Sequence, residues 1–380
     1  MKFLVLGSGM MGKAIAYDLA QSTTTERVLL ADADETRARE TAHQLPSKVR
    51  PLVLDVNQHR EVVNAMKQCD VAIGAVSYRY NVSLTKAALE SQVHYCDLGG
   101  NDEVIEEQLG LDAAAKKQNI SVIPNCGLAP GLANILGART AELFDSVDSM
   151  RMRVGGLPQH PLPPFNYQIV FSAEGLLNEY SGKSKVIRNF KIAEVDTLTE
   201  IEAIAFPSPF GILEAFHTSG GASMTPKLFE GKIRELDYKT IRYPGHCERF
   251  RTLLDLGFGS DEPMSIGANV LTEKEVFIEL LKKKIPQAGP DVVLMKVDVE
   301  GIRSGKKQKC EITMIDYFDE SRNISAMMRG TAYPTSVIAQ FLASGVIANH
   351  GVITPEQCVP LDPLLAELRA RGMTIIQKWT

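Results

Sequence analysis

The chain has 380 residues, of which 44% are hydrophobic and 23% are charged, and its formal net charge is -5. This balance is typical of a soluble globular protein with two or three domains. The negative charge offers no basic face for nucleic acid, and no apolar run reaches the roughly 18 residues that a membrane span requires. We therefore expect a cytoplasmic protein that binds a small molecule, with no nucleic-acid or membrane partner.

The cysteines and histidines give no sign of a metal site. The six cysteines lie far apart, none of them forms a C-x-x-C pair, and no H-E-x-x-H pair occurs. The chain starts directly in a strand-like run, so no cleavable leader is expected. We expect reduced thiols, as is usual in the cytoplasm, and no bound metal.

The first residues contain the pattern of a dinucleotide-binding turn. The apolar run Phe3–Leu6 is followed by G-S-G-M-M-G and then by a helix-type pattern. In this context the first glycine permits a tight turn, the second admits a pyrophosphate, and the third lets the helix pack against the strand. The helix N-terminus offers unpaired N–H groups to the phosphates. We predict cofactor contacts from Gly7, Ser8, Gly9, Met10, Met11 and Gly12; the alternative is a purely structural turn.

An acidic residue after the second strand indicates which cofactor binds. The apolar run Val28–Ala31 ends at Asp32, which lies 20 residues after Gly12. A carboxylate at this position hydrogen-bonds the 2′-hydroxyl of NAD and repels the 2′-phosphate of NADP. Arg37 and Arg39 lie nearby and leave some tolerance of NADP open, although a solvated helix face explains them as well. The sequence predicts NAD.

The next stretch alternates strand and helix patterns. Strands are expected at Val49–Val56, Asp70–Val76, His94–Leu98 and Ile120–Ile123, and helices at Asp34–Leu45, Gln58–Gln68, Val82–Glu90 and Glu103–Lys117. This spacing predicts an α/β fold, a Rossmann doubly wound parallel sheet whose carboxyl ends meet at one edge, where ligands bind. Further cofactor contacts are expected at that edge from Asp55, Val56, Val76, Ser77 and Leu98.

After residue 132 the strict alternation stops. Strands are expected at Ser149–Val154, Ile187–Lys191, Leu198–Ala205, Thr240–Arg242, Val292–Gly301 and Gln308–Asp319, the last two as a hairpin, with a Pro/Gly loop at Gly155–Pro164. Helices are expected at Ala133–Glu142, Ala173–Tyr180, Gly245–Leu256, Glu273–Lys284 and Ser336–Leu342. This mixture predicts an inserted α+β domain that forms the other wall of the cofactor cleft.

We expect three segments in the chain. Residues 1–132 form the NAD-binding Rossmann domain, residues 133–343 the substrate and dimerisation domain, and residues 344–380 a C-terminal return to the Rossmann domain. The tail reads as a helix at Leu364–Arg371 followed by a strand.

Two residues beyond the fifth and sixth strands are candidates for catalysis, because a nicotinamide cofactor implies hydride transfer near these strand ends. A half-buried carboxylate at Asp97 has a raised pKa and serves as a base or as an anion that binds an amine. The alternative is that Asp97 caps the turn at Gly99-Gly100. Cys126 lies in a loop rich in Gly and Pro, and the alternative for it is a small buried residue.

Candidate substrate contacts lie mostly in the second domain. Arg242 stands at a strand end, where a guanidinium can bind a carboxylate with two hydrogen bonds, and His246 at a helix start can donate to the substrate or relay a proton. A surface salt bridge and a helix cap or core histidine are the alternatives. Tyr78, Glu174 and Thr218 complete the set of candidates; Glu174 is equally explained as a residue of a first helical turn.

The motifs GSGMMG, GAVSYRYN, HYCDLGG, NCGLAPGLAN, FSAEGLLNEYSGK, TIRYPGH and GVITPEQCV together resemble the saccharopine dehydrogenase/reductase-type family over nearly the whole chain. The resemblance implies a Rossmann domain, an inserted substrate domain that also dimerises, and oxidation or reduction at a carbon–nitrogen bond of lysine-like or polyamine-like substrates. The active-site aspartate and cysteine of the family fall on Asp97 and Cys126, and its substrate-domain arginine falls on Arg242.

Two departures from saccharopine reductases favour one reaction within the family, the NAD-dependent oxidative deamination of the L-lysine 6-amino group. The chain is shorter, and Asp32 favours NAD, whereas those reductases generally use NADP. Ala129 also stands where they tend to carry Asp. The first alternative is a saccharopine- or carboxynorspermidine-type reductase that joins an amine and an aldehyde. The second, from another class, is a non-catalytic NAD-sensing protein. We expect a homo-oligomer, a dimer or larger.

Overall fold

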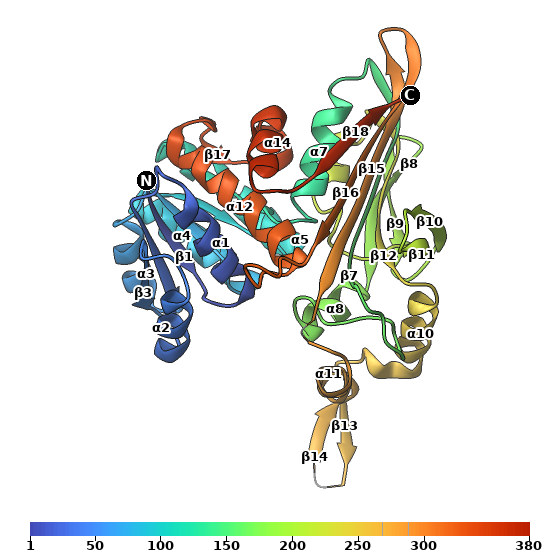
Figure 1. Cartoon of the computed structure of the whole chain (residues 1–380), viewed down its shortest axis with the longest axis horizontal. Coiled ribbons are helices and arrows are strands. Elements are labelled where there is room, and N and C mark those ends of the chain that lie inside the picture. Colours follow the sequence, from blue (N-terminus) through green and yellow to red (C-terminus); the bar gives the residue numbers. More distant parts are fainter. Residues whose placement is uncertain (268, 288) are drawn as a thin grey trace. The chain divides into compact units, whose positions relative to one another are not determined.

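A computed structural model describes residues 1–267, 269–287 and 289–380 of the chain (Figure 1). The chain divides into two compact units. The first consists of Met1–Glu142 with Met328–Ile375, and the second of Leu143–Met327 with Ile376–Thr380. Helix α12 (Ala326–Ser344) therefore belongs almost entirely to the first unit, whereas the predicted boundary at residue 343 assigns it to the second. In the described residues no helix is long and apolar enough to cross a membrane.

The first unit contains the predicted doubly wound sheet. Its seven strands lie in the order β17-β6-β5-β4-β1-β2-β3, and every neighbouring pair is parallel. The strands are β1 (Lys2–Leu6), β2 (Arg27–Asp32), β3 (Val49–Val53), β4 (Val71–Gly74), β5 (His94–Asp97), β6 (Ser121–Ile123) and β17 (Gly351–Val352). The order reverses at β1, so the switch point at which ligands bind lies beside its carboxyl end.

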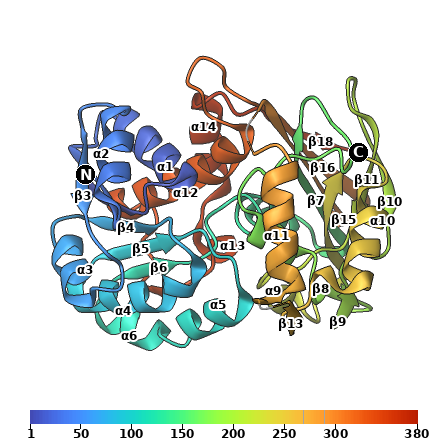
Figure 2. The ribbon, with the colours of Figure 1, turned by 90° about the horizontal axis from the view of Figure 1, so that it is seen from below.

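Helices cover both faces of this sheet. Figure 2 shows α1, α2 and α12 on one face and α3, α4 and α6 on the other. The helices are α1 (Met10–Gln21), α2 (Glu35–His43), α3 (His59–Met66), α4 (Asn81–Ser91), α5 (Asp102–Leu109), α6 (Asp112–Lys117), α7 (Leu132–Ala141), α12, α13 (Pro355–Cys358) and α14 (Leu361–Ala370). Apolar side chains of strands and helices, such as Leu4, Val62 and Leu84, form one buried cluster between the layers.

Two predicted elements of this unit are wrong in their bounds. The helix predicted at Glu103–Lys117 is two helices, because Gly110 ends α5 and the chain turns before α6. The third strand ends at Val53 rather than Val56, because the Asp55 carboxylate accepts hydrogen bonds from the Asn57 backbone and side chain and starts a turn.

The second unit contains a nine-stranded mixed sheet. Its main path is β10-β11-β12-β7-β15-β16-β18, and β8 pairs with β12 and β9. The strands are β7 (Ser146–Pro158), β8 (Lys183–Arg188), β9 (Lys191–Asp196), β10 (Glu202–Phe206), β11 (Gly211–Phe216), β12 (Ile233–Arg242), β15 (Asp291–Arg303), β16 (Lys306–Tyr317) and β18 (Ile375–Trp379). The predicted hairpin is confirmed as β15–β16, and the α+β character of this unit is confirmed as well.

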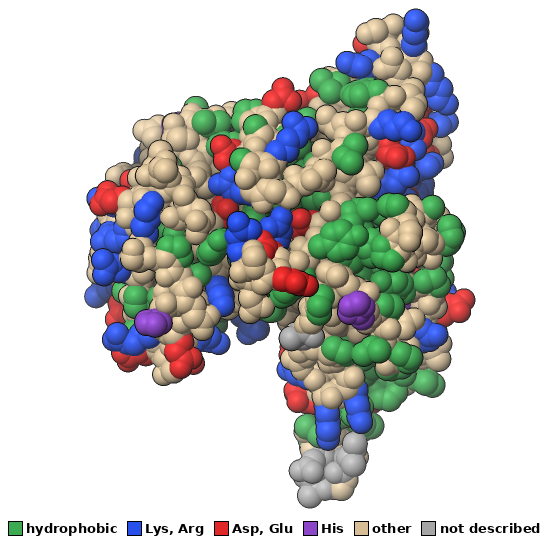
Figure 3. Space-filling view, viewed as in Figure 1, with side chains coloured by type: hydrophobic (Ala, Val, Ile, Leu, Met, Phe, Trp, Pro, Cys, Tyr) green, Lys and Arg blue, Asp and Glu red, His purple; other side chains and the backbone are tan. Residues whose placement is uncertain are grey.

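Four helices and a separate hairpin complete the second unit. They are α8 (Ala173–Glu179), α9 (Thr225–Phe229), α10 (His246–Leu253), α11 (Glu273–Lys284) and the hairpin of β13 (Pro263–Ile266) with β14 (Asn269–Thr272). In the space-filling view, hydrophobic side chains gather over the strands of this unit (Figure 3). Among its apolar residues, Ile212 is 62% exposed and Tyr317 is 45% exposed.

Several expectations for the second unit are corrected. The predicted loop Gly155–Pro164 is strand as far as Pro158. Gly155 does not form a turn but lets two strands approach closely, because a Cβ there would lie 2.4 Å from the Ile241 carbonyl oxygen. The predicted helix Gly245–Leu256 ends as α10 at Leu253 and continues as a short π-helical turn. Strands β9, β11, β13 and β14 were not predicted.

The C-terminal tail returns to the first unit only in part. Arg371, just after α14, donates from Nε to both carboxylate oxygens of Asp18 in α1 at 2.9 Å, and Ser336 of α12 donates to the same carboxylate at 2.6 Å. The last strand, β18, instead joins β16 in the second sheet, where Thr380 and Lys309 exchange backbone hydrogen bonds. The tail therefore serves both units.

Candidate functional site

The turn between β1 and α1 has the features of a phosphate-binding turn. Gly7 adopts φ +104°, and a Cβ there would lie 2.5 Å from the Ala75 carbonyl oxygen; a Cβ on Gly12 would lie 1.8 Å from the Gly7 carbonyl oxygen. Both positions therefore require glycine. A Cβ on Gly9 would meet no atom within 4 Å, so the space beside this residue is open for a ligand. These residues and the N-terminus of α1 fit the pyrophosphate of a dinucleotide.

Asp32, the last residue of β2, is held by four hydrogen bonds. Its carboxylate accepts from Ser8 N at 2.9 Å, Ser8 Oγ at 2.8 Å, Asp34 N at 3.0 Å and Arg37 Nη2 at 2.7 Å. Partial burial alone would raise the pKa of Asp32, but the hydrogen bonds from Arg37, Asp34 and Ser8 together lower it to about 2. The group is therefore ionised at every physiological pH, at the position where a dinucleotide presents its ribose.

The remaining predicted cofactor residues lie at the carboxyl edge of the first sheet, Met10 and Met11 at the start of α1 and the others after β3, β4 and β5. Met10, Met11, Asp55, Val56, Val76, Ser77 and Leu98 all retain solvent exposure. Tyr78 opens the 3-10 turn η1 (Tyr78–Tyr80) and lies beside the loop after β5, since a Cβ on Gly100 would be 3.1 Å from its ring. The structure thus brings these residues together with the glycine turn and Asp32 at one sheet edge.

Asp97 is fully buried at the end of β5. Its Oδ1 accepts from Gly99 N at 2.8 Å and Asn125 N at 3.4 Å, and its Oδ2 accepts from Gln108 Nε2 at 2.7 Å. Burial raises the pKa of Asp97 to about 6, and the three hydrogen bonds only partly oppose this shift. The carboxylate therefore caps the turn at Gly99-Gly100, which was the alternative to a catalytic role. Its pKa is also near the value that a general base needs at neutral pH.

Cys126 lies in the loop after β6 and is fully buried. Its thiol donates to the Ile123 carbonyl at 3.2 Å, and its backbone N–H donates to the Asp97 carbonyl at 2.8 Å. Burial, followed by the neighbouring thiol of Cys96, raises the pKa of Cys126 well above its ordinary value. Cys126 is thus a neighbour of Asp97 in the structure, and its side chain is a neutral thiol rather than a thiolate.

Arg242, the last residue of β12, forms the centre of a polar cluster in the second unit. It is 3% exposed, donates from Nε to the Tyr180 hydroxyl at 2.9 Å and from Nη1 to the Ile241 carbonyl at 2.9 Å, and its guanidinium lies 4.9 Å from the centre of the Tyr167 ring. Burial alone would lower the pKa of Arg242, but Tyr180, Tyr167 and Glu179 raise it, so the guanidinium is charged.

A hydrogen-bond chain fixes Arg242 from behind. The Tyr180 hydroxyl lies 2.8 Å from His246 Nε2, and His246 Nδ1 lies 3.0 Å from the Phe165 carbonyl. Because a carbonyl only accepts, His246 must donate from Nδ1. The Tyr180 hydroxyl accepts from Arg242 Nε, so its own hydrogen is available for Nε2 of a neutral His246. Burial, and then the charge of Arg242, lowers the pKa of His246 to about 3, which agrees with this assignment. His246 therefore supports Arg242 through Tyr180.

A carboxylate from a neighbouring strand positions the start of α10. Glu214 of β11 accepts from Gly245 N at 2.8 Å and from Cys247 N at 2.7 Å, so it satisfies two amides at this helix N-terminus. Gly245 itself adopts φ +83°, which favours glycine. The sequence reasoning did not identify Glu214, because its strand was not predicted.

Two predicted substrate residues have other partners. Glu174 is paired with Lys282 of α11 at 2.8 Å and is half exposed. It is a surface residue of the first turn of α8, as the alternative to substrate binding predicted. The Thr218 hydroxyl, which is buried, bonds to that of Thr240 at 2.7 Å. Neither makes a hydrogen bond or ion pair with Arg242 among the described residues, and the structure gives no reason to group them with it.

Besides Tyr180, two residues next to Arg242 were missed by sequence reasoning. Glu179, the last residue of α8, has Oε2 3.7 Å from Arg242 Nη2. Burial raises the pKa of Glu179 to about 7, and the charge of Arg242 opposes this shift. Since 34% of the side chain is still exposed, water reduces the shift below the value that full burial would give. The second is Tyr167, whose ring underlies the guanidinium. The only sign in the sequence that could have pointed to this part of the cluster was the dipeptide Glu179-Tyr180 at the end of a predicted helix.

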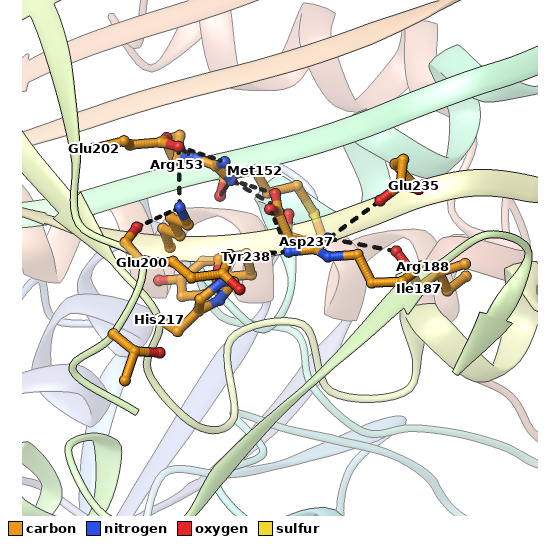
Figure 4. Close-up of polar contacts among 12 residues, drawn as sticks. Met152, Arg153, Ile187, Arg188, Glu200, Glu202, His217, Glu235, Asp237 and Tyr238 are labelled. Carbon is orange, nitrogen blue, oxygen red and sulfur yellow. Dashed lines mark hydrogen bonds and ion pairs between the residues drawn. The ribbon is translucent and has the colours of Figure 1, made fainter. Parts of the chain in front are cut away.

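A second charged cluster on the same sheet is satisfied internally (Figure 4). Arg153 of β7 bonds to Glu202 and, at 2.7 Å, to Asp237, while Lys239 bonds to Glu202 at 3.0 Å. His217 lies 3.0 Å from Glu200. Because each buried cation faces a carboxylate, the charges of this network compensate one another and need no ligand. Among the described residues, no group of three or more His, Cys, Asp or Glu could hold a metal ion.

The parallel sheet, the glycine turn and the acidic end of β2 define a dinucleotide-binding oxidoreductase fold with an inserted mixed-sheet unit. Two family models match the chain. The saccharopine dehydrogenase NADP binding domain matches residues 3–123, and the saccharopine dehydrogenase C-terminal domain matches residues 127–373. The chain belongs to the saccharopine dehydrogenase family, and it is an oxidoreductase of the amino-acid dehydrogenase class.

Curated relatives and solved structures agree with this assignment. Saccharopine dehydrogenase [NADP(+), L-glutamate-forming] of Pyricularia oryzae is 23% identical and aligns with 97% of this chain and 96% of its own length; that of Schizosaccharomyces pombe is 22% identical, with 98% and 97% covered. The apo saccharopine dehydrogenase of Saccharomyces cerevisiae has a TM-score of 0.82 at 18% identity, covering 100% of this chain and 99% of that one. The homospermidine synthase of Legionella pneumophila in complex with NAD has a TM-score of 0.70 at 13% identity, with 100% and 91% covered. These structural likenesses show the fold.

Proposed function

We propose that this protein catalyses the NAD-dependent oxidative deamination of the 6-amino group of L-lysine, the lysine 6-dehydrogenase reaction. The products are 2-aminoadipate 6-semialdehyde, ammonia and NADH. The observation that carries the proposal is the ionised carboxylate of Asp32 at the ribose position, because it favours NAD over the NADP named for the curated relatives.

Each residue has a definite task in this reaction. The glycine turn and Asp32 would hold NAD, and its nicotinamide would supply the acceptor for the hydride of the carbon that carries the amine. Before that step, a base must take a proton from the substrate ammonium, because a cationic nitrogen cannot assist hydride departure. We assign this task to Asp97, whose pKa of about 6 leaves most of it ionised at neutral pH. Water then adds to the imine and ammonia leaves, so that one water is consumed for each NADH formed.

Binding of the substrate's α-carboxylate is assigned to Arg242. The guanidinium is charged and is held in place through Tyr180, so it can bind a carboxylate with two hydrogen bonds without first losing side-chain freedom. Cys126 remains a proposed lining residue of the nicotinamide pocket. Its thiol is neutral, so a direct role as a base is disfavoured.

A reductase that joins an amine and an aldehyde is the second candidate. The names of the curated relatives and of the homospermidine synthase favour it. Ala129, which stands where saccharopine reductases tend to carry Asp, argues against the same substrate contacts.

The decisive assay measures NADH formation by purified protein with L-lysine and NAD, with NADP in parallel. We expect turnover with NAD and the release of one ammonia per NADH. Oxidation of reduced cofactor only when an aldehyde and an amine or glutamate are both supplied would establish the reductase instead. Tight NAD binding without turnover in either direction would support the sensor. The expected homo-oligomer also stays a prediction, which sedimentation velocity tests.

A further inference from the structure

We propose that Glu179 and Tyr167 complete Arg242 into a receptor for the zwitterionic head of an α-amino acid. In this assignment Arg242 and the Tyr167 hydroxyl hold the carboxylate, and Glu179 holds the α-ammonium group. The inference deepens the proposed function, on which it rests for the choice of an amino acid as ligand. It concerns only residues of the second unit.

Arg242 retains donors for a ligand. A guanidinium has five N–H groups, and the described residues accept from Nε and from one N–H of Nη1. Nη2 faces Glu179 at 3.7 Å, which is too long for a hydrogen bond. A buried guanidinium with free donors is costly unless an anion binds it, so the position is suited to a carboxylate.

The Tyr167 hydroxyl provides an independent sign of a ligand. Tyr167 is 2% exposed, and its hydroxyl has no hydrogen-bond partner among the described residues. The nearby Val170 amide lowers the pKa of Tyr167, but it makes no hydrogen bond of normal geometry with the hydroxyl. Since buried hydroxyls are almost always paired, and this one lies on the ring beneath the Arg242 guanidinium, a ligand that binds Arg242 can also satisfy Tyr167.

Glu179 supplies the opposite charge at the rim of the cluster. Its backbone is fixed, because its carbonyl accepts from Ser219 N at 2.8 Å, while a third of its side chain is exposed. The carboxylate can therefore rotate to admit a ligand without disturbing the core. In an α-amino acid the ammonium and the carboxylate are separated by a single carbon, so a carboxylate next to a guanidinium matches both charges at once.

The same pair of charges rejects ligands that carry only one of them. A carboxylate ligand without an α-amine places two anions together at Glu179, and an amine without a carboxylate leaves Arg242 without its anion. Unpaired and like charges in a buried site weaken binding more strongly than the loss of one contact. The receptor is therefore predicted to select α-amino acids over simple acids and over di- or polyamines.

Three ligands with the same alkyl chain test the assignment without any turnover. They are L-norleucine, hexanoate, which lacks the α-amine, and pentylamine, which lacks the carboxylate. Their binding is measured by isothermal titration calorimetry on the full chain in the presence of NAD. We expect L-norleucine to bind about 10- to 100-fold more tightly than either of the others.

Two variants assign the roles. Glu179→Gln should weaken L-norleucine binding about 10- to 100-fold and leave hexanoate binding equal or stronger. Tyr167→Phe should weaken both carboxylate ligands about 3- to 10-fold and leave pentylamine unaffected. Glu248→Gln, which removes an exposed carboxylate from α10, is the matched control and should change nothing. Thermal denaturation checks that every variant is folded.

The inference is overturned if L-norleucine binds no better than hexanoate, or if Glu179→Gln binds L-norleucine as the parent does. The proposed function fails separately. If L-norleucine is selected and depends on Glu179, but L-lysine gives no NADH, then the receptor stands and only the reaction is wrong.

Discussion

The glycine turn of the first unit and the Arg242 cluster of the second unit both hold a charged side chain at low exposure, but with opposite consequences. Asp32 has four hydrogen-bond donors from its own unit, and its charge is stabilised before any ligand arrives. Arg242 has aromatic rings around it, and among the described residues its one ion-pair partner is Glu179, at 3.7 Å. This difference fits the two proposed roles, in which Asp32 selects between dinucleotides at the ribose and Arg242 binds the carboxylate of the substrate.

Removal of the Arg242 charge should strongly reduce activity. Arg242→Met keeps the side-chain volume but removes the anion-binding group, so we expect kcat/KM for L-lysine to fall about 100- to 1000-fold, with the affinity for NAD unchanged. Steady-state kinetics and NAD titration measure the two quantities.

The matched control for this variant is Arg251→Met, which removes an exposed arginine from α10 and should leave both quantities as they are. An Arg242→Met protein that is folded and still has the parent kcat/KM would show that the cluster does not anchor the substrate.

A change at Asp32 should alter the choice of cofactor rather than abolish activity. Asp32→Ala removes the acceptor for the ribose hydroxyls and frees Arg37 to face a 2′-phosphate, so we expect NAD to bind about 10- to 100-fold more weakly and NADP to gain relative to NAD. Kinetics with both cofactors measure the ratio.

Glu35→Ala is the control for Asp32→Ala, since Glu35 is exposed and paired with Arg39 on the same helix. An unchanged preference for NAD in Asp32→Ala would refute the role of this carboxylate in cofactor selection.

Asp97 should reveal itself in the pH dependence of stability. Its folded pKa of about 6 lies above the ordinary 3.8, so between these values the native state binds more protons than the unfolded state, and stability falls as pH rises. Ionisation of Asp97 lowers the free energy of unfolding by about 3 kcal/mol at neutral pH. Asp97→Asn should flatten this dependence, because an amide does not titrate. The variant should still fold, because Gln108, whose Oε1 has no partner in the described part of the chain, can turn its amide to accept from Asn.

Denaturation by urea at several pH values measures this effect. The difference between Asp97→Asn and the parent should be small near pH 4 and should favour the variant above about pH 7. The same variant should lose about 10²- to 10⁴-fold in kcat if Asp97 is the base. A near-normal kcat would leave Asp97 with its turn-capping role alone.

The smallest effect is expected from the chain behind Arg242. Tyr180→Phe removes one hydrogen bond to the guanidinium, so KM for L-lysine should rise about 3- to 10-fold with kcat unchanged. Because the pKa of His246 is about 3, KM should show no titration of this residue at working pH. A titration near pH 6.5 that His246→Asn abolishes would contradict the neutral assignment.

The first unit could be predicted well because its signals are local. Each βα step pairs a strand with the helix that follows it, and Gly7, Gly12 and Asp32 act within one such unit. Two misses there were also local, because Gly110 ends a helix and Asp55 starts a turn, whereas α12 and β17 join this unit from far along the chain. In the second unit, neighbouring strands are far apart in sequence, as β12 beside β7 shows, and Gly155 was misread because its constraint comes from Ile241.

The sequence by itself determined the parallel sheet, the dinucleotide turn, the acidic residue at the end of β2, and Arg242 as a strand-end candidate for binding a carboxylate. Only the tertiary structure decided which residues surround Arg242. Glu179 and Tyr180 end α8, Tyr167 lies in the loop before this helix, and His246 begins α10, and their contacts with Arg242 arise from packing of these segments against the end of β12. The physical reason is that periodicity encodes which face of an element is buried, whereas the partner of a buried polar group is set by long-range packing that no local pattern records.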